Sequence, residues 1–228
     1  MVDISVAIGG GSALEVLIPV WFYIFSGLAY FASSAISFAV SYFAFRIYKT
    51  SNSKKFLALG IIFLVLGISF FALTLSSIYT YLYVPYFRET ARIPVGIFNT
   101  NAFNFYYITS LISYLLLFIT YFPKEAKKKL YVLYVPLWFI SSADFHTASL
   151  FLLAFVVSRA AYNFYKTRST NTLLVLLAFS LMAVFHIFIF LLPFDLTLYL
   201  LSHALLAAGF VSLLVMLIRV NRSGRSRK

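Results

Sequence analysis

Apolar residues along the chain gather into seven long runs, separated by short segments rich in polar residues, charges or proline. A bilayer core about 30 Å thick needs about 20 helical residues to cross it, so runs of this size bounded by charges or turn residues predict membrane-spanning helices. The predicted spans are 20–47, 56–84, 99–122, 130–142, 145–165, 173–192 and 196–220. The fourth is short, contains Pro136, and joins the fifth through a break at 141–144.

The composition agrees with this pattern. Of the 228 residues 63% are hydrophobic and only 11% are charged, whereas soluble domains are near a quarter charged. We therefore expect an all-α polytopic bundle of seven transmembrane helices, a single domain over residues 1–228 in the cell membrane. Residues 1–15 are expected to form a short outer segment with Gly9–Gly11 as a joint, and residues 221–228 a basic cytoplasmic tail. The absence of cysteine excludes disulfides and thiolate metal sites.

The positions of the charges predict the orientation, because Lys and Arg in short loops are retained on the cytoplasmic side. Assigning alternate loops to one side collects all but two of the 18 cations, Arg88 and Arg92 being the exceptions. The opposite side holds five of the six acids, so the N-terminus is expected outside and the C-terminus inside. We expect anionic lipid, rather than nucleic acid, to be the partner of the membrane-proximal cations Lys54, Lys55, Lys127, Lys128, Lys129, Arg222 and Arg225.

One internal similarity is visible. The segment Tyr48–Ser53 aligns with Tyr165–Thr170, which places the turn after the first predicted helix onto the turn after the fifth. A duplication would give two parallel three-helix units joined by the fourth helix, a 3+1+3 arrangement. The alternative is that both segments are cytoplasmic turns of similar composition.

In layout the chain resembles the broad group that includes microbial rhodopsins and the SWEET and PQ-loop carriers. In its composition and its Leu200–Phe210 stretch it also resembles small seven-helix membrane proteins of thermophilic archaea. These resemblances imply a seven-helix bundle with an outer N-terminus. Retinal is excluded as a cofactor because the last predicted span, like the others, contains no lysine to form a Schiff base. The chain also lacks the PQ dipeptide of the PQ-loop carriers.

The three histidines all fall near the outer ends of predicted spans. His186 and His203 lie on adjacent helices at roughly equal depth, about 9 to 11 Å from the outer surface, and His146 opens the fifth predicted helix. An imidazole in hydrocarbon needs a partner. It can form a hydrogen bond within the bundle, bind a ligand or proton, or ligate a metal ion or a b-type haem. We expect His186 and His203 to face each other and to contribute to a ligand or metal site.

Polar side chains also recur at helical spacing within the spans. The third predicted helix carries a stripe of Thr100, Asn104, Tyr107, Tyr114 and Tyr121, and shorter stripes are Tyr30, Ser33, Ser37 and Ser41, and Ser69, Ser76 and Tyr83. Interhelical hydrogen bonds explain such stripes. The alternative is a solvated cavity that opens outward near Asn101, Asn104 and Tyr107. In the last helix the small residues Ala204, Ala208 and Ser212 predict a close-packing face.

No catalytic motif accompanies these features. The sequence holds no phosphate-binding glycine loop, no GxSxG elbow and no acid deep in a span, so we predict that the chain is not an enzyme. Three classes of function remain. The polar stripes favour a carrier or sensor for a small ligand. The others are an accessory or anchoring subunit, with membrane-protein partners or further copies of the chain, and an electron-transfer subunit that holds haem or metal through His186 and His203.

Overall fold

The computed structural model describes residues 2–6, 14–18, 21–83, 92–121, 142–191 and 197–225, and helix side chains within 22–83, 99–121, 142–191 and 197–223. Its elements in chain order are β1 (Val2–Val6), β2 (Leu14–Ile18), α1 (Trp21–Ser51), α2 (Lys54–Tyr83), α3 (Arg92–Tyr121), α4 (Ser142–Thr167), α5 (Thr170–Phe190) and α6 (Thr197–Arg225). All six described helices are long and apolar enough to cross a membrane. The chain is therefore built as a helical, multi-pass membrane protein.

Five of the seven predicted spans correspond to α1, α2, α4, α5 and α6, with ends that differ by a few residues. The third corresponds to α3, which begins at Arg92 rather than at residue 99. Pro94 is compatible with this earlier start, because the N–H groups of the first helical turn have no partner within the helix. The predicted fourth span lies outside the described residues, apart from Ser142, which begins α4.

The N-terminal segment is not wholly irregular. β1 and β2 pair antiparallel, with Val2 opposite Ile18 and Val6 opposite Leu14. Valine and isoleucine are frequent in both strands, and β-branched residues favour extended backbone. The sequence analysis did not predict this hairpin, whereas the expectation of an all-α membrane bundle is confirmed by the long helices that form the rest of the described chain.

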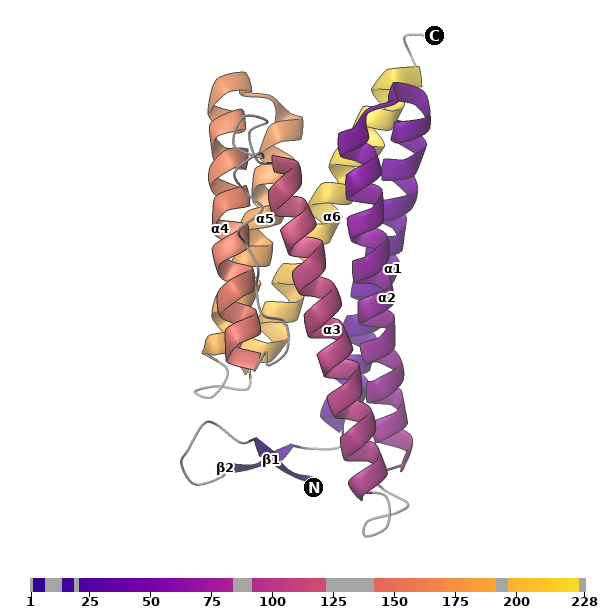
Figure 1. Cartoon of the computed structure of the whole chain (residues 1–228), viewed down its shortest axis with the longest axis vertical. Coiled ribbons are helices and arrows are strands. Elements are labelled where there is room, and N and C mark those ends of the chain that lie inside the picture. Colours follow the sequence, from indigo (N-terminus) through magenta and orange to yellow (C-terminus); the bar gives the residue numbers. More distant parts are fainter. Residues whose placement is uncertain are drawn as a thin grey trace.

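Ring contacts establish that α3 and α4 run in the same direction. Tyr107 packs on Phe145 with ring centroids 4.7 Å apart, and Phe118 packs on Phe155 further along both helices at 4.6 Å. Figure 1 shows the same arrangement, with the end of α3 and the beginning of α4 at opposite ends of the bundle.

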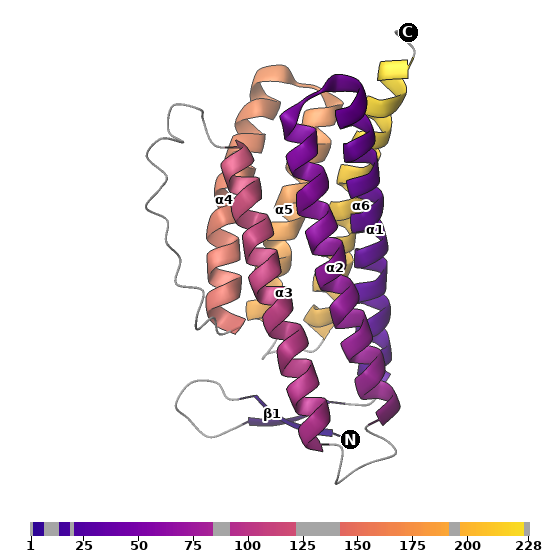
Figure 2. The same ribbon diagram turned by 45° about the vertical axis from the view of Figure 1, so that its right-hand side comes forward.

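Contacts between α1 and α6 likewise indicate parallel helices. Phe22 packs on Tyr199 at 4.6 Å between centroids, and Tyr30 packs on His203 at 5.2 Å. Within α1–α3 and within α4–α6, consecutive helices are antiparallel. The described bundle thus consists of two sets of three consecutive helices that run in the same sense, α1–α3 and α4–α6, which we call the two three-helix units. The last helix, α6, passes behind α3 from the side of α4 and α5 to the side of α1 and α2 (Figures 1 and 2).

Serine–glycine contacts hold α1 close to α2. Ser34 Oγ donates to the carbonyl oxygen of Gly67, and one heptad later Ser41 Oγ donates to that of Gly60, both at 2.8 Å. The ring of Phe38 covers Gly67, where a Cβ atom would lie 2.7 Å from it. Interhelical hydrogen bonding is therefore confirmed for Ser41, and the absence of a side chain at the glycines permits the close approach.

The close-packing position of α6 is Gly209. A Cβ atom there would lie 2.9 Å from the backbone oxygen of Ala178 in α5. The predicted face is wrong, because Ala204 and Ala208 are exposed and Ser212 alone of that set is buried. A spacing of four residues identifies a helical face, but it does not reveal whether that face points to protein or to lipid.

Two turns share one geometry. Asn52 after α1 and Arg168 after α4 have φ values of 50° and 51°. Their N–H groups donate to Tyr48 O and Phe164 O respectively, both at 2.8 Å, as expected of a left-handed residue that ends a helix. Asn52 thus corresponds to Arg168, whereas the sequence alignment placed it on Ser169, so that alignment is wrong by one residue.

We predict that Gly209→Ala destabilises the protein by about 1 to 3 kcal/mol, because the added methyl group must displace backbone rather than a side-chain tip. The measurement is the temperature at which detergent-solubilised protein loses its monodisperse gel-filtration peak. Ala208→Leu is the matched control, since this neighbour is exposed and should tolerate the larger side chain. Equal midpoints for Gly209→Ala and the unmodified chain would contradict the packing described here.

Candidate functional site

Seven buried aromatic rings form a closed circuit of contacts through all six described helices. Each ring is at most 6% exposed, and successive centroids are 4.9 to 6.4 Å apart. In order of contact the rings are Tyr30 (α1), Phe70 (α2), Tyr106 (α3), Phe145 (α4), His186 and Phe185 (α5), and His203 (α6), which returns to Tyr30. We call this set the aromatic layer. Ring pairs at such separations are favourable beyond their burial, so the layer joins the two units.

Two histidines form a buried pair against this layer. The Nδ1 atoms of His146 and His186 are 2.8 Å apart. The Nε2 atom of His186 lies 3.3 Å from the hydroxyl of Tyr114. Side chains from α3, α5 and α4 therefore make one hydrogen-bonded chain. Two neutral imidazoles suffice for it, since one Nδ1 carries a hydrogen and the other supplies a lone pair.

His203 has a different partner. Its Nδ1 atom lies 3.0 Å from the backbone oxygen of Tyr199, and because a carbonyl only accepts, this nitrogen carries the hydrogen. The ring of Phe185 contacts both His186 and His203. The expectation that His186 and His203 pair with each other is thus wrong, and His146 takes that place. Their common depth follows from the sequence, but the direction in which each ring points depends on helix rotation.

A second polar group joins α6 to α1. The hydroxyl of Tyr199 lies 2.9 Å from that of Tyr30 and 3.1 Å from Ser26 Oγ. All three side chains are buried. Like the contact of Tyr114 with His186, this group links one three-helix unit to the other.

The residues of the predicted stripe on the third helix do not share one environment, because some are exposed and others are buried. Asn101 and Asn104 are exposed, so the structure does not bring them to the histidines. Tyr107 is half-buried, stacks on Phe145, and its ring centroid is 6.3 Å from that of His146. Of the three α3 residues proposed to bind ligand, only Tyr107 therefore lies beside the histidine pair.

Sequence reasoning missed Asn99, a half-buried amide next to the start of this stripe. The Oδ1 atom of Asn99 accepts hydrogen bonds from Ser76 and Thr80 of α2. The stripe on α2 was a correct signal, since Ser69 also reaches α3, where its hydroxyl is 2.6 Å from that of Thr109. Interhelical hydrogen bonding is confirmed for both serines of that stripe.

Ser149 is a buried hydroxyl without a hydrogen-bond partner. It lies three residues after His146, on the same face of α4, and is fully buried. Ser33, Ser37 and Ser110 also carry buried hydroxyls without a partner, so what distinguishes Ser149 is its position one turn from His146. The described residues contain no group of three or more His, Asp or Glu side chains able to hold a metal ion.

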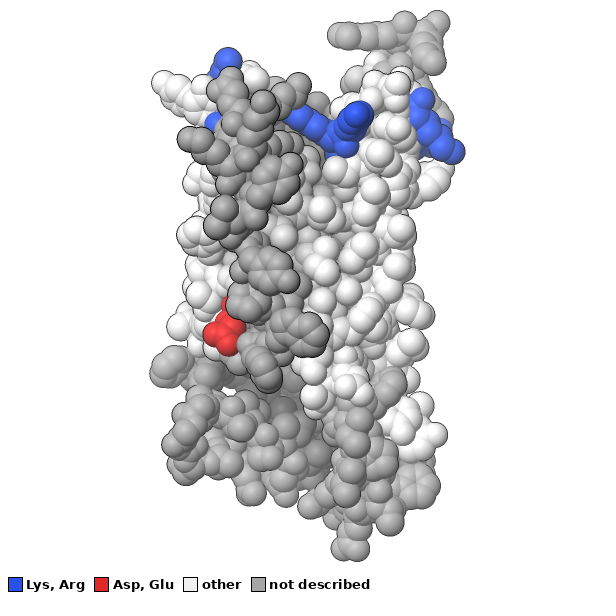
Figure 3. Space-filling model, viewed as in Figure 1, with Lys and Arg blue, Asp and Glu red and all other residues white. Residues whose placement is uncertain are grey.

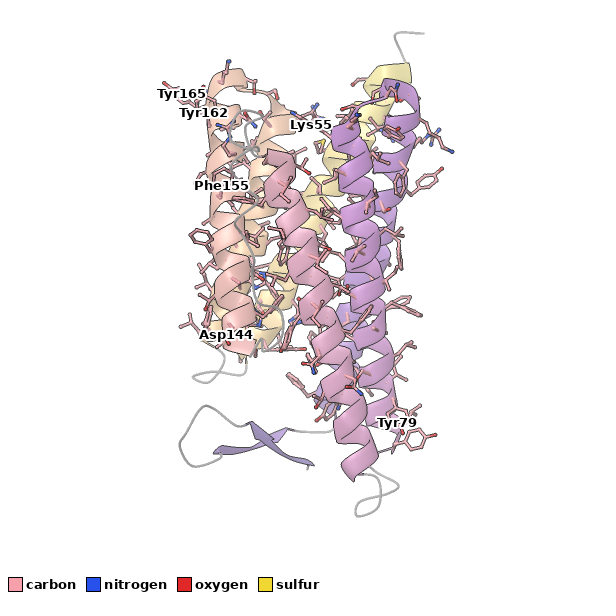
Figure 4. The ribbon with its side chains drawn as sticks, viewed as in Figure 1. Lys55, Tyr79, Asp144, Phe155, Tyr162 and Tyr165 are labelled. Atoms are coloured by element: carbon pink, nitrogen blue, oxygen red, sulfur yellow. The ribbon has the colours of Figure 1, made fainter. Side chains whose placement is uncertain are left out.

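Described basic side chains gather at one end of the bundle, opposite Asp144 (Figure 3). Figure 4 places Lys55 at this basic end, with Asp144 and Tyr79 at the other. Of the cations expected to contact lipid, those with described side chains are Lys54, Lys55 and Arg222. Lys127, Lys128 and Lys129 lie outside the described residues, as does the side chain of Arg225.

We predict that Tyr114→Phe lowers stability by about 1 kcal/mol, because it removes the partner of a buried ring nitrogen of His186 at constant shape. Tyr162→Phe is the control, since Tyr162 is 55% exposed. Thermal unfolding of the two variants in the same detergent measures the difference. A Tyr114→Phe midpoint no lower than that of the control would contradict the hydrogen bond.

Comparison of this chain with protein-family models, with curated proteins and with solved structures finds no match. The resemblance to the rhodopsin, SWEET and PQ-loop group therefore stays a prediction.

Proposed function

We propose that this chain is a membrane carrier for a small solute, with its binding site at the aromatic layer between the two three-helix units. The observation that carries the proposal is the set of buried Tyr–His and Tyr–Tyr contacts where the units meet. Polar groups inside a membrane bundle are expensive, and carriers built from repeated units bind substrate between the units. Movement of one unit against the other would expose these groups to each side in turn.

The proposal includes a seventh crossing. The end of α3 and the beginning of α4 lie at opposite ends of the bundle (Figure 1), and residues 122–141 follow α3 and precede α4 in the sequence. The apolar run 130–142 is available for that passage. Two parallel units joined by one further crossing give the 3+1+3 order, which supports a carrier over a simple anchor.

The gathering of basic residues supports an orientation in which the turns after α1 and α4 lie on the cytoplasmic side of the cell membrane. Lys54 and Lys55 lie by the first of these turns and Arg168 by the second, at the end of the bundle opposite Asp144. The N-terminus is then outside, and the histidine pair lies in the outer half of the bundle.

The site chemistry points to binding through neutral groups. Its buried polar side chains are hydroxyls and imidazoles, and Asp144, the one acid whose side chain the structure describes, is exposed. Coupling through a buried carboxylate therefore has no candidate among the described side chains. Hydrogen bonds from Tyr107, Tyr114 and Ser149 would orient a solute, and we retain the prediction that no reaction is catalysed.

The orientation can be tested in the natural cysteine-free background. We expect Ser5→Cys to react with a membrane-impermeant maleimide applied to intact cells, and Ser53→Cys to react only after the cells are opened. Detection of the label on the purified chain is the measurement. Labelling of Ser53→Cys in intact cells would overturn the orientation.

Carriage predicts that the buried site is reachable from each side in turn. We expect Ser149→Cys to react with a small charged thiosulfonate in intact cells and also in inside-out vesicles. Phe151→Cys is the control, since Phe151 is 71% exposed on the same helix and should face lipid, where a thiol stays un-ionised. Reaction from the outside alone would favour a receptor, and no reaction from either side would favour a structural subunit. Both results would contradict carriage.

A further inference from the structure

We propose that His146 and His186 form a binding site for a soft monovalent metal cation, copper(I) or silver(I). Their Nδ1 atoms face each other at 2.8 Å, from α4 and α5. Imidazole nitrogen is a good ligand for copper, and two such nitrogens are enough for a monovalent ion with a filled d shell, which accepts two-coordinate geometry. This site does not depend on whether the chain is a carrier.

The surroundings of His186 resemble those of a metal ligand. Its second nitrogen, Nε2, lies 3.3 Å from the hydroxyl of Tyr114. Metal-binding histidines usually donate the N–H of their other ring nitrogen to such a partner, which fixes the tautomer and orients the ring. With the hydrogen on Nε2, the lone pair of Nδ1 of His186 points toward His146.

The cation would take the place of the hydrogen shared by the two Nδ1 atoms. The Nδ1 hydrogen of His146 then moves to its own Nε2, so both rings remain neutral and the net charge increases only by that of the cation. Two bonds of about 2 Å in a near-linear arrangement place the ligand nitrogens about 4 Å apart, so the pair must open by about 1 Å from its present separation of 2.8 Å. His146 is the ring that can move, because it lies near the beginning of α4 and is the less deeply buried of the two.

The charge of the site favours a monovalent ion over a divalent one. Asp144 is exposed, and two residues of separation place it on nearly the opposite side of α4 from His146. Without a buried anion, the cost of burying an ion rises with the square of its charge. Ring centroids of Tyr107, Phe185 and Phe190 lie 6.0 to 6.3 Å from that of His146, so the described neighbours of this imidazole include three uncharged aromatic rings.

Two other side chains could bind soft metals and serve as matched controls. His203 is as buried as His146, but its Nδ1 is held by the backbone oxygen of Tyr199. Met182 lies one turn before His186 on α5, and its Cγ atom lies 3.4 Å from the position of a Cβ on Gly209, so it points to α6. Neither side chain belongs to the proposed site.

The test is a calorimetric titration of the full chain in lipid nanodiscs with silver nitrate, in buffer free of chloride and thiols. We expect one silver ion per chain in the unmodified protein, in His203→Gln and in Met182→Leu. Binding should weaken at least tenfold in His146→Gln and in His186→Gln. Equal binding by all five proteins, or no binding by the unmodified chain, would overturn the site.

A second measurement keeps the test decisive if His186→Gln fails to fold. Silver should raise the thermal midpoint of the unmodified chain, and His146→Gln should abolish this shift because the ion then stabilises no folded site. X-ray absorption of the silver complex should show two nitrogen ligands, and sulfur ligation would overturn the assignment. Failure of the silver test leaves the thiol-accessibility result unaffected, so this site and the carrier proposal can fail separately.

Discussion

The structure depends on one constraint: hydrocarbon offers no hydrogen-bond partner, so most polar side chains buried in a membrane bundle bond to the protein itself. Several hydroxyl groups form a hydrogen bond with the backbone of their own helix. Thr74 and Ser113, for example, bond the carbonyl oxygens four residues before them. Imidazole and phenol groups stand too far from their own backbone to do this readily. His203 is an exception, because its Nδ1 atom bonds the backbone oxygen of Tyr199 in the same helix. Tyr30, Tyr114, His146 and His186 form hydrogen bonds with side chains of other helices, and these bonds favour the packing of the helices that carry them.

The size of the side chains sets how closely each pair of helices can approach. Between α1 and α2, Ser34 bonds the backbone at Gly67 directly, which requires near contact of the two helices. Between the two units, rings fill the space, and the link from Tyr114 to His186 passes through two side chains. Hydrogen bonds to backbone thus join α1 to α2 within a unit, whereas bonds between side chains join one unit to the other.

Much of the fold was predictable from the sequence. Five spans were placed within a few residues. The alignment of Tyr48–Ser53 with Tyr165–Thr170 compared two turns that each hold a left-handed residue, and a duplication stays a prediction. The register of that alignment was wrong because it followed residue identity, whereas the turn is defined by the left-handed backbone of Asn52 and Arg168. The β-hairpin was not predicted, because each of its two strands has only five residues and neither forms an apolar run long enough to cross a membrane. The prediction of the fourth span remains open.

The sequence by itself determined depth. A bilayer sorts residues along one axis, so the lengths of the apolar runs and the common depth of the histidines within their helices can be read along the chain. Only the tertiary structure decided which side chains of each helix point into the bundle and which point outward. It turned Ala204 and Ala208 outward, exposed Asn104, and paired His186 with His146 across α5 and α4. The physical reason is that helix rotation is set by packing among several helices at once, and the spacing of residues within one helix does not contain that information.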